Sequence, residues 1–372
     1  MKACVTGATG FLGAHLVRHL RERGHEVRVT YRTDARLGRL GGADVEAVKA
    51  DVLEPASMRR AVKGCDLLFH TAGYVGAKPP ERVWQMNALS PRIAVEAAAA
   101  EGVARVVLTS SVAAVGPAGR DGKPVDEDRP YLASRLRLTY GDAKHEGEVE
   151  ALAAAGRTGV EVVIVNPAYV LGAPVDRSDL GETSTRIVGN YLRGRLPAVM
   201  DGGASICDVR DVARGHLRAA MKGKPAERYI LGGHNITWVE LVDRMAELSG
   251  IHHPVPVIPR EAVGVLRTPE RLGLPSGAFI DPEAFGLMGA LWWGSSSKAQ
   301  RRLDYKIRPL AETLQDTIEW YEELIAAGAF AGDGTSRLSL AAGAVRIGGR
   351  LGLVPVMKAA ERRIGRRLVA GA

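Results

Sequence analysis

The chain has 372 residues, of which 46% are hydrophobic and 25% are charged, a composition typical of soluble globular proteins rather than of fibrous or disordered ones. This length allows one large α/β domain with a smaller lobe, or two domains. The three cysteines, Cys4, Cys65 and Cys207, have no paired spacing, which argues against a disulfide framework or a structural zinc site. We therefore expect a cytoplasmic protein.

The net charge of +8 is concentrated at one end of the chain. From residue 333 onward, eight Lys or Arg face only Asp333 and Glu361, a net charge of +6 that leaves +2 for the first 332 residues. The main body therefore lacks the basic character of a nucleic-acid-binding domain. We expect no signal peptide, because the chain does not begin with a charged leader followed by an apolar core of about 7–15 residues. We also expect no membrane-spanning segment, because no uncharged apolar stretch reaches about 18 residues.

Residues 1–167 alternate strand-like and helix-like segments. The predicted strands are rich in Val, Ile and Leu and lie at 2–7, 26–32, 45–51, 66–73, 105–111 and 161–167. The helical patterns between them lie at 11–23, 55–63, 80–101 and 140–156. This alternation predicts an α/β fold with a Rossmann-type, doubly wound parallel sheet, which binds ligands at the carboxyl ends of its strands.

The alternation loosens after residue 168. Loops are expected at 171–183 and 197–208, among helices at 184–194, 211–221, 237–249 and 309–327. We interpret residues 168–330 mainly as a smaller substrate-binding lobe over the ligand edge of the sheet, with some later segments returning to the dinucleotide-binding domain.

Residues 331–372 differ from the rest in composition. Within them, 356–369 can form a helix with one apolar side and with Arg362, Arg363, Arg366 and Arg367 over much of the remainder. Such a basic amphipathic helix can lie on an anionic membrane surface. Alternatively, this helix packs on the body of the protein or on a partner subunit, or the segment is a disordered extension.

A glycine-rich loop follows the first predicted strand and begins the first helix. Its spacing is Gly7-x-x-Gly10-x-x-Gly13: the first glycine permits a tight turn, the second admits a pyrophosphate, and the third lets the helix pack on the strand. Free N–H groups at the helix N-terminus favour phosphate. We predict a dinucleotide site here, formed by Gly7, Thr9, Gly10, Phe11, Leu12 and Gly13.

The end of the second strand indicates which dinucleotide binds. An acidic residue there would accept hydrogen bonds from the ribose of NAD, but the chain has Tyr31 and Arg32 instead. A guanidinium is the natural partner of a 2′-phosphate, so NADP(H) is favoured. In the alternative, Arg32 is solvated and Asp34 turns back to bind NAD(H).

The ends of the next strands should supply further cofactor contacts. Asp51 and Val52 are expected near the adenine, whereas Thr71, Ala72 and Gly73 are small enough for the backbone to lie against the dinucleotide. We expect His70 to be a core histidine without a catalytic role.

Tyr140 and Lys144 lie one helical turn apart and therefore on one face of the predicted helix. We expect the ammonium and a nicotinamide cation to lower the pKa of the phenol from its ordinary value near 10. Tyr140 could then exchange a proton with the oxygen of an alcohol or carbonyl as hydride moves. Ser111, after the fifth strand, would hydrogen-bond that oxygen, and Lys144 would also hold the nicotinamide ribose.

The motifs "TGATGFLG", Asp51-Val52, "HTAG", "TSSVAAVG", "YGDAK", "NPAYVLG" and "DVRDVA" occur in this order. Over about residues 1–328 the chain resembles the extended short-chain dehydrogenase/reductase family, part of the NAD-dependent epimerase/dehydratase superfamily. The resemblance implies that Ser111, Tyr140 and Lys144 are catalytic. It also implies a cofactor-supporting role for Asn87, although that side chain could simply bond to the local backbone. One departure is Ala143, where a small hydroxyl residue is usual.

The combination of Asn166-Pro167 with Arg32 resembles the branch of the family that contains dihydroflavonol reductases, cinnamoyl-type reductases and 3β-hydroxysteroid dehydrogenases. This resemblance implies that Asn166 and Pro167 contact the cofactor. The segment 195–237 is also similar to hopanoid-associated proteins named as sugar epimerases.

The expected activity is NADP(H)-dependent reduction of a lipophilic ketone or aldehyde. Alternatives are a nucleotide-sugar epimerase or dehydratase with tightly bound NAD(P), and a dinucleotide-sensing scaffold. Relatives often form homodimers through helices equivalent to 80–101 and 140–156.

The substrate is expected to be a small molecule held by loops after strands four to six and by the late lobe. Tyr74 and Tyr169 are the candidate substrate residues besides Ser111. The remaining apolar wall is assigned to 74–84, 169–171 and 279–293, with Phe279, Phe285, Leu287, Met288, Trp292 and Trp293. We expect some of these residues to belong to the core instead. His252 and His253 have no further ligands at metal spacing, so no metal site is predicted.

Overall fold

The computed structural model describes residues 1–76, 78–119, 121–132, 134, 138–180, 184–260 and 287–330. The expected extension at 331–372, and Phe279 and Phe285 of the expected substrate wall, lie outside these residues. Within the described part of the chain, no helix is long and apolar enough to cross a membrane.

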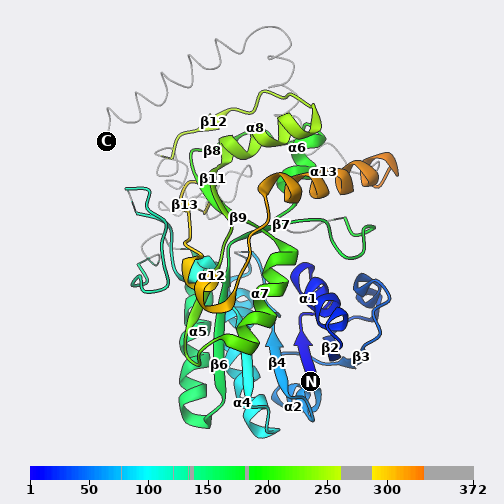
Figure 1. The fold of residues 1–372 in the computed structure, drawn as a ribbon, viewed down its shortest axis with the longest axis vertical. Coiled ribbons are helices and arrows are strands. Elements are labelled where there is room, and N and C mark those ends of the chain that lie inside the picture. Colours follow the sequence, from blue (N-terminus) through cyan, green and yellow to red (C-terminus); the bar gives the residue numbers. More distant parts are fainter. Residues whose placement is uncertain are drawn as a thin grey trace.

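A seven-stranded parallel sheet forms the body of the molecule (Figure 1), in the order β10-β6-β5-β4-β1-β2-β3. Its strands are β1 (Lys2–Thr6), β2 (Glu26–Tyr31), β3 (Glu46–Lys49), β4 (Leu67–His70), β5 (Arg105–Thr109), β6 (Glu161–Pro167) and β10 (Arg228–Leu231). In its centre Val107 pairs with Phe69 on one side and Val163 on the other. Runs of buried apolar residues favour such central parallel strands, since both faces are covered.

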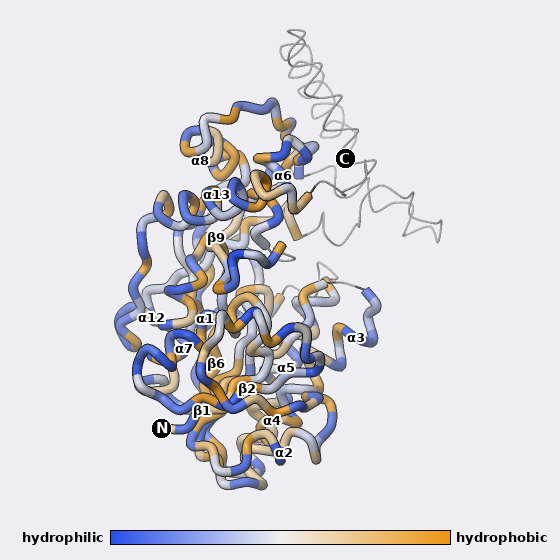
Figure 2. The backbone as a smooth tube through the Cα atoms, turned by 90° about the vertical axis from the view of Figure 1, so that its right-hand side faces the viewer, coloured by the Kyte–Doolittle hydropathy of each residue, from blue (hydrophilic) through white to orange (hydrophobic). Residues whose placement is uncertain are grey.

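Helices cover both faces of this sheet, which confirms the predicted Rossmann-type architecture. One layer contains α1 (Phe11–Glu22), α7 (Val209–Lys222) and α12 (Ser297–Leu303). The other contains α2 (Pro55–Val62), α4 (Ser90–Ala100) and α5 (Thr139–Thr158). The predicted helix 80–101 is present as α3 (Pro80–Trp84), a π-helical turn η2 (Gln85–Leu89) and α4. Figure 2 shows β1, β2 and β6 as hydrophobic segments inside these layers.

A smaller lobe lies beyond the carboxyl ends of the strands (Figure 1). Strands β7 (Tyr169–Leu171), β9 (Gly203–Asp208), β11 (His234–Thr237) and β13 (Leu291–Trp292) form its main sheet, and β8 (Val199–Met200) pairs with β12 (Val257–Ile258). Its helices are α6 (Arg186–Leu192), α8 (Trp238–Ser249) and α13 (Leu310–Ala326). Thr237 and Glu240 form a capping box that begins α8. The lobe has its own apolar core, which includes Trp238, Trp320 and Tyr321.

The prediction of a loop over 197–208 was wrong, because this stretch contains β8 and β9. Strand β9 carries no alternating apolar pattern, yet all six of its residues are buried. A Cβ on Gly203 would lie 2.3 Å from the carbonyl oxygen of Ile236, so the close pairing with β11 depends on the glycine. Strand β10 was also missed: four residues from the middle of the lobe sequence return to the edge of the main sheet.

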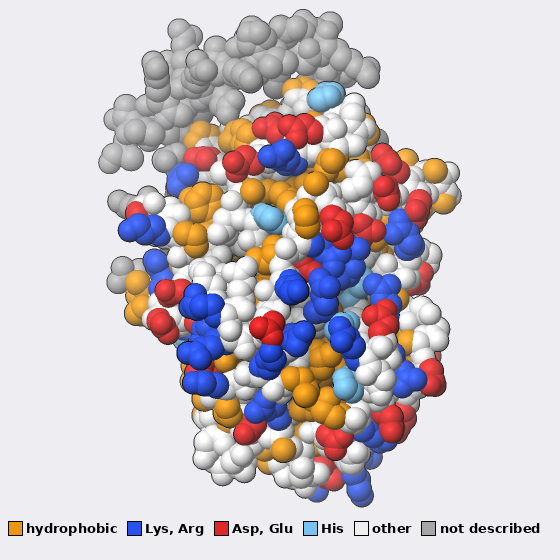
Figure 3. Space-filling view, viewed as in Figure 1, with side chains coloured by type: hydrophobic (Ala, Val, Ile, Leu, Met, Phe, Trp, Pro, Cys, Tyr) orange, Lys and Arg blue, Asp and Glu red, His pale blue; other side chains and the backbone are white. Residues whose placement is uncertain are grey.

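Buried ion pairs connect the main body to the lobe near the start of α7, where Figure 3 shows Lys and Arg side chains gathered on the surface. Asp208 accepts a hydrogen bond from Arg210 Nη2 at 2.7 Å and another from Thr313 Oγ1 of α13 at 2.9 Å. Arg308, just before α13, donates to Asp211 of α7 at 3.0 Å. These contacts hold the lobe over the carboxyl edge of the sheet.

Candidate active site

The glycine-rich loop turns between β1 and α1 as predicted from its spacing. Gly7 has a φ of +68°, and the Gly10 N–H donates to its carbonyl oxygen at 2.9 Å. A Cβ on Gly7 would lie 2.6 Å from the backbone nitrogen of Ala72, and one on Gly13 would lie 2.2 Å from the carbonyl oxygen of Gly7. Any larger side chain would therefore displace the loop from the end of β4.

Threonine and histidine side chains join the ends of β1 and β4. The Thr71 hydroxyl donates to the carbonyl of Thr6 at 2.5 Å. Both ring nitrogens of His70 have partners, Thr6 Oγ1 and Ser90 Oγ, each at 3.0 Å. Burial lowers the pKa of His70 to about 3, so the ring is neutral and belongs to the core.

At the end of β2, Arg32 and Asp34 differ in their surroundings. Burial and the nearby Asp34 carboxylate raise the pKa of the Tyr31 hydroxyl. Arg32 is exposed, and its guanidinium makes no hydrogen bond or ion pair with other described residues. Further along the edge, Asp51 Oδ1 accepts from the Leu53 N–H at 3.0 Å and Val52 is buried. Arg32 is thus the available cation at the position that meets the adenosine ribose in this fold.

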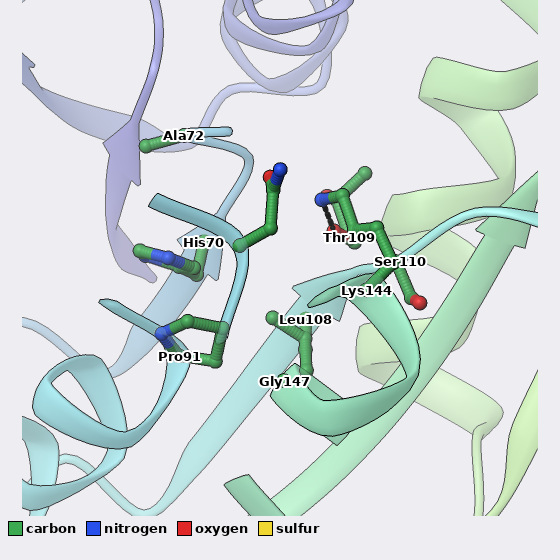
Figure 4. Close-up of a pocket in the computed structure, with 9 residues that line it drawn as sticks. His70, Ala72, Pro91, Leu108, Thr109, Ser110, Lys144 and Gly147 are labelled. Atoms are coloured by element: carbon green, nitrogen blue, oxygen red, sulfur yellow. Dashed lines mark hydrogen bonds between the residues drawn. The ribbon is translucent and has the colours of Figure 1, made fainter. Parts of the chain in front are cut away.

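A pocket lies between the ends of β4 and β5 and the helices α4 and α5 (Figure 4). Its lining comprises His70, Ala72, Asn87, Pro91, Leu108, Thr109, Ser110, Lys144 and Gly147. The Lys144 ammonium donates to the carbonyl oxygen of Thr109 at 3.0 Å. A Cβ on Gly73 would lie 3.2 Å from Lys144 Nζ, so any side chain at position 73 would press on the ammonium.

Ser111 and Tyr140 meet beside this pocket. Ser111 lies two residues after the end of β5, and its Oγ accepts from the Ala113 N–H at 3.2 Å at the start of the 3₁₀ turn η3 (Val112–Ala114). Its hydroxyl also lies close enough to the Tyr140 hydroxyl to lower the pKa of the phenol. The structure therefore brings together Ser111, Tyr140 and, one turn along α5, Lys144.

The protein surroundings shift the pKa of Tyr140 in the direction opposite to our expectation. Burial raises this pKa, because the phenolate loses solvation, and the nearby Ser111, among the residues that the structure describes, lowers it without reversing the shift. Lys144 is directed at the Thr109 carbonyl, and burial lowers its own pKa to about 8. The ammonium alone therefore does not activate the phenol.

Two asparagines hydrogen-bond the backbone of residues around the site. The Asn87 amide holds the backbone of Tyr74: Nδ2 donates to the carbonyl at 2.8 Å and Oδ1 accepts from the N–H at 3.1 Å. This is the local-backbone alternative for Asn87. Asn166 Nδ2 donates both to the Ser111 carbonyl at 2.9 Å and to Glu148 Oε1 at 2.6 Å. Its neighbour Pro167 is buried at the end of β6.

Glu148 was missed by the sequence analysis. The available signal was its position four residues after Lys144, which places a carboxylate on the same buried face of α5. The candidate substrate tyrosines have local partners: Tyr74 donates to the Lys78 carbonyl and Tyr169 to the Ser184 carbonyl, each at 2.8 Å. Burial raises the pKa of Tyr169.

The expected apolar wall divides between core and surface. Trp292 belongs to the core of the lobe, with an exposed fraction of 5%, and its indole N–H donates to the Leu287 carbonyl. Met288 packs partly buried against this core, Trp293 is half-buried, and Leu287 is exposed. Trp292 is therefore one of the expected wall residues that belong to the core instead, because its ring completes the lobe.

These features fit a nicotinamide dinucleotide. The Gly7–Gly13 loop excludes any Cβ where the backbone approaches the phosphates, and Gly73 opens toward the buried Lys144 ammonium. The carboxyl ends of β1, β4 and β5 are adjacent in the sheet, so the loop and the catalytic candidates share one edge.

Comparisons with known proteins agree with this geometry. Residues 3–232 match the model of the NAD dependent epimerase/dehydratase family. The chain is 33% identical over 328 residues to a protein described as a dihydroflavonol 4-reductase from Synechocystis, covering 86% of this chain and 94% of that one. It is 31% identical to sterol demethylase protein B of Methylococcus capsulatus, covering 87% and 99%.

Among solved structures, a nucleoside-diphosphate-sugar epimerase from Pseudomonas aeruginosa is 27% identical, with a TM-score of 0.71 and coverage of 87% of this chain and 98% of that chain. The family model alone spans more than half of the sequence. The chain therefore belongs to the NAD-dependent epimerase/dehydratase family and is an NAD(P)-dependent reductase/dehydrogenase of the extended short-chain type.

Proposed function

We propose that the chain uses NADPH to reduce the carbonyl group of a lipophilic ketone or aldehyde to an alcohol. The observation that carries this proposal is that Ser111 and Tyr140 lie next to each other, one helical turn from the buried Lys144, at the edge where the dinucleotide loop lies.

NADPH, when bound, supplies the hydride that is added to the carbonyl carbon. Tyr140 donates its phenolic proton to the carbonyl oxygen, which becomes the alcohol oxygen, and Ser111 donates a hydrogen bond to the same oxygen. Lys144 stabilises the resulting phenolate and holds the nicotinamide ribose. The raised pKa of Tyr140 keeps the phenol protonated near neutral pH, which suits the direction of reduction.

Arg32 supports the choice of NADPH over NADH. Its exposed guanidinium makes no ion pair with a carboxylate of the described residues, and the Asp34 carboxylate lies near the Tyr31 hydroxyl instead. A bidentate guanidinium–phosphate contact would distinguish the two cofactors.

Exposed apolar side chains favour a lipophilic substrate. Val75 is 86% exposed and Trp84 41% exposed, both on the segment that follows β4 at the ligand edge. Two relatives carry names that refer to a dihydroflavonol and a sterol, and both compounds are fused-ring molecules without a phosphate group. Peripheral membrane contact through residues 331–372 and a homodimer stay predictions from the sequence.

The test follows the absorbance of reduced nicotinamide with purified protein, NADPH or NADH, and a panel of apolar ketones and aldehydes. We expect NADPH consumption with one chemical class, and Tyr140→Phe should abolish turnover while leaving NADPH binding intact. Unchanged turnover in Tyr140→Phe would refute the mechanism.

A nucleotide-sugar epimerase or dehydratase is the second candidate, supported by the structural likeness to the nucleoside-diphosphate-sugar epimerase. This candidate would be favoured if no carbonyl compound of the panel led to cofactor consumption and if denaturing the purified protein released a nicotinamide cofactor. Such an enzyme would regenerate its bound cofactor without consuming any that is added.

A further inference from the structure

A buried carboxylate lies directly behind the catalytic candidates. Glu148 is on α5, one turn after Lys144, and only 4% of it is exposed. Its Oε1 accepts from Asn166 Nδ2 at 2.6 Å, and its Oε2 lies 3.3 Å from Arg228 Nη1. Acidic residues are rarely buried to this degree without a defined role in structure or chemistry.

The Asn166 amide connects this carboxylate to the active-site serine. The same Nδ2 that donates to Glu148 also donates to the Ser111 carbonyl at 2.9 Å. Because Glu148 binds one amide hydrogen, it fixes the plane of the amide and hence the direction of the second hydrogen. A continuous chain of contacts therefore runs from Arg228 on the edge strand β10 to Ser111.

Arg228 is itself anchored, so the chain of contacts has a rigid end. Its guanidinium donates to the carbonyl oxygens of Glu127 at 2.9 Å and Arg129 at 3.3 Å. The Glu127 carboxylate in turn accepts from the Ile230 N–H at 2.8 Å. Glu148 is thus placed by three separate segments of the chain rather than by α5 alone.

Glu148 also acts on Lys144 through charge. Burial lowers the pKa of Lys144 to about 8, and the Glu148 carboxylate raises it. His70, on the other side of the ammonium, is neutral because burial lowers its pKa to about 3. Tyr140 is also uncharged near neutral pH. Glu148 is therefore the carboxylate that supports the ammonium form of Lys144.

Groups from several elements act on the pKa of the Glu148 carboxyl, which lies above its usual value. Burial raises the pKa of its carboxyl, while Ser110 after β5, Arg228 on β10, Asn166 on β6 and His145 on α5 lower it. The hydrogen bonds and the guanidinium offset part of the desolvation of the carboxylate.

We propose that Glu148 is a positioning residue of the reduction: it orients Ser111 through Asn166 and favours the ammonium form of Lys144. The expected effect of Glu148 on turnover rests on the proposed function. The expected effect of Glu148 on cofactor binding is independent of the substrate, since Lys144 meets the bound dinucleotide whichever substrate is used.

The charge effect is tested with Glu148→Gln, which keeps the size of the side chain. NADPH binding is measured by fluorescence across pH 6 to 10. In the parent protein the affinity should fall as Lys144 loses its proton. Because the variant lacks the supporting negative charge, its affinity should fall at a lower pH, displaced by about one pH unit. The alkaline limb of kcat/KM should move in the same direction.

Glu150→Gln is the matched control. It removes the same charge from the same helix two residues later, where Glu150 is half-buried and pairs with Arg92 at 3.3 Å. Its pH dependence should coincide with that of the parent protein. An unshifted Glu148→Gln, or an equal shift in Glu150→Gln, would overturn the charge effect. A shift in binding without any carbonyl reduction would leave the inference standing and refute the proposed substrate chemistry.

Glu148→Asp tests the positioning of Ser111. The charge remains, so the pH dependence should stay close to that of the parent protein. The carboxylate is shorter by one methylene and loses Asn166, so kcat should fall about three- to tenfold while KM changes little. Parent-like kcat would overturn the positioning role, and this variant still decides that question if thermal melts show that Glu148→Gln does not fold.

Discussion

The backbone of Gly147 lies directly against the carbonyl of Asn87: a Cβ built on Gly147 would stand 2.0 Å from that oxygen. Helix α5 therefore approaches the π-helical turn η2 more closely than any other residue type would permit. This approach places Lys144, one turn earlier, beside Gly73 and in the pocket that Asn87 also lines.

Gly147→Ala should therefore damage both stability and activity. The added methyl group would push α5 away from η2 and lower the free energy of unfolding by about 1–3 kcal/mol. Urea denaturation measures this effect. Gly156→Ala on the same helix is the control, because its Cβ would meet nothing within 4 Å, and it should raise stability by about 0.5–1 kcal/mol. Equal stability of the two variants would show that the close approach is absent in solution.

Arg32→Ser should weaken NADPH binding by about tenfold or more, since a charge-assisted contact contributes about 1.5–3 kcal/mol. NADH binding should change little, and the loss should shrink as the salt concentration rises. Titration of cofactor fluorescence measures both affinities. Arg23→Ser is the control, because Arg23 is an exposed arginine at the C-terminal end of α1, away from the glycine-rich loop. If Arg32→Ser weakened NADH and NADPH equally, the assignment of Arg32 to the 2′-phosphate would be wrong.

Asp208→Asn should destabilise the fold in a pH-dependent way. Burial alone would raise the pKa of Asp208, but the Arg210 guanidinium and its N–H outweigh burial and hold that pKa below its usual value of 3.8. The carboxylate therefore contributes stability above about pH 4 that is lost as the pH falls through its folded-state pKa. We expect a loss of about 2 kcal/mol at pH 7 that diminishes below pH 4.

Urea denaturation of the parent protein and of Asp208→Asn between pH 7 and pH 3 checks this expectation. Asp44→Asn serves as the control, because the Asp44 side chain is 93% exposed although it pairs with Arg21, and exposed pairs contribute about 0–1 kcal/mol. If the difference in the free energy of unfolding between the parent protein and Asp208→Asn stayed constant down to pH 3, the Asp208 charge would not stabilise the contact between the main body and the lobe.

The sequence by itself determined the features that depend on short-range geometry. The spacing of Gly7, Gly10 and Gly13 predicts a phosphate-binding turn because the conformational freedom of glycine is a local property. The spacing of Tyr140 and Lys144 places them on one face because the helical period is 3.6 residues. The six strands before residue 168 were likewise predicted from local runs of apolar residues, and all six are present in the sheet.

Only the tertiary structure decided which distant residues meet. Glu148, Asn166 and Arg228 converge because β6 lies between β5 and β10, and strand order is not encoded in any local pattern. The direction of the pKa shift of Tyr140 was likewise decided by burial, which depends on the packing of the whole chain around the phenol rather than on its neighbours in sequence.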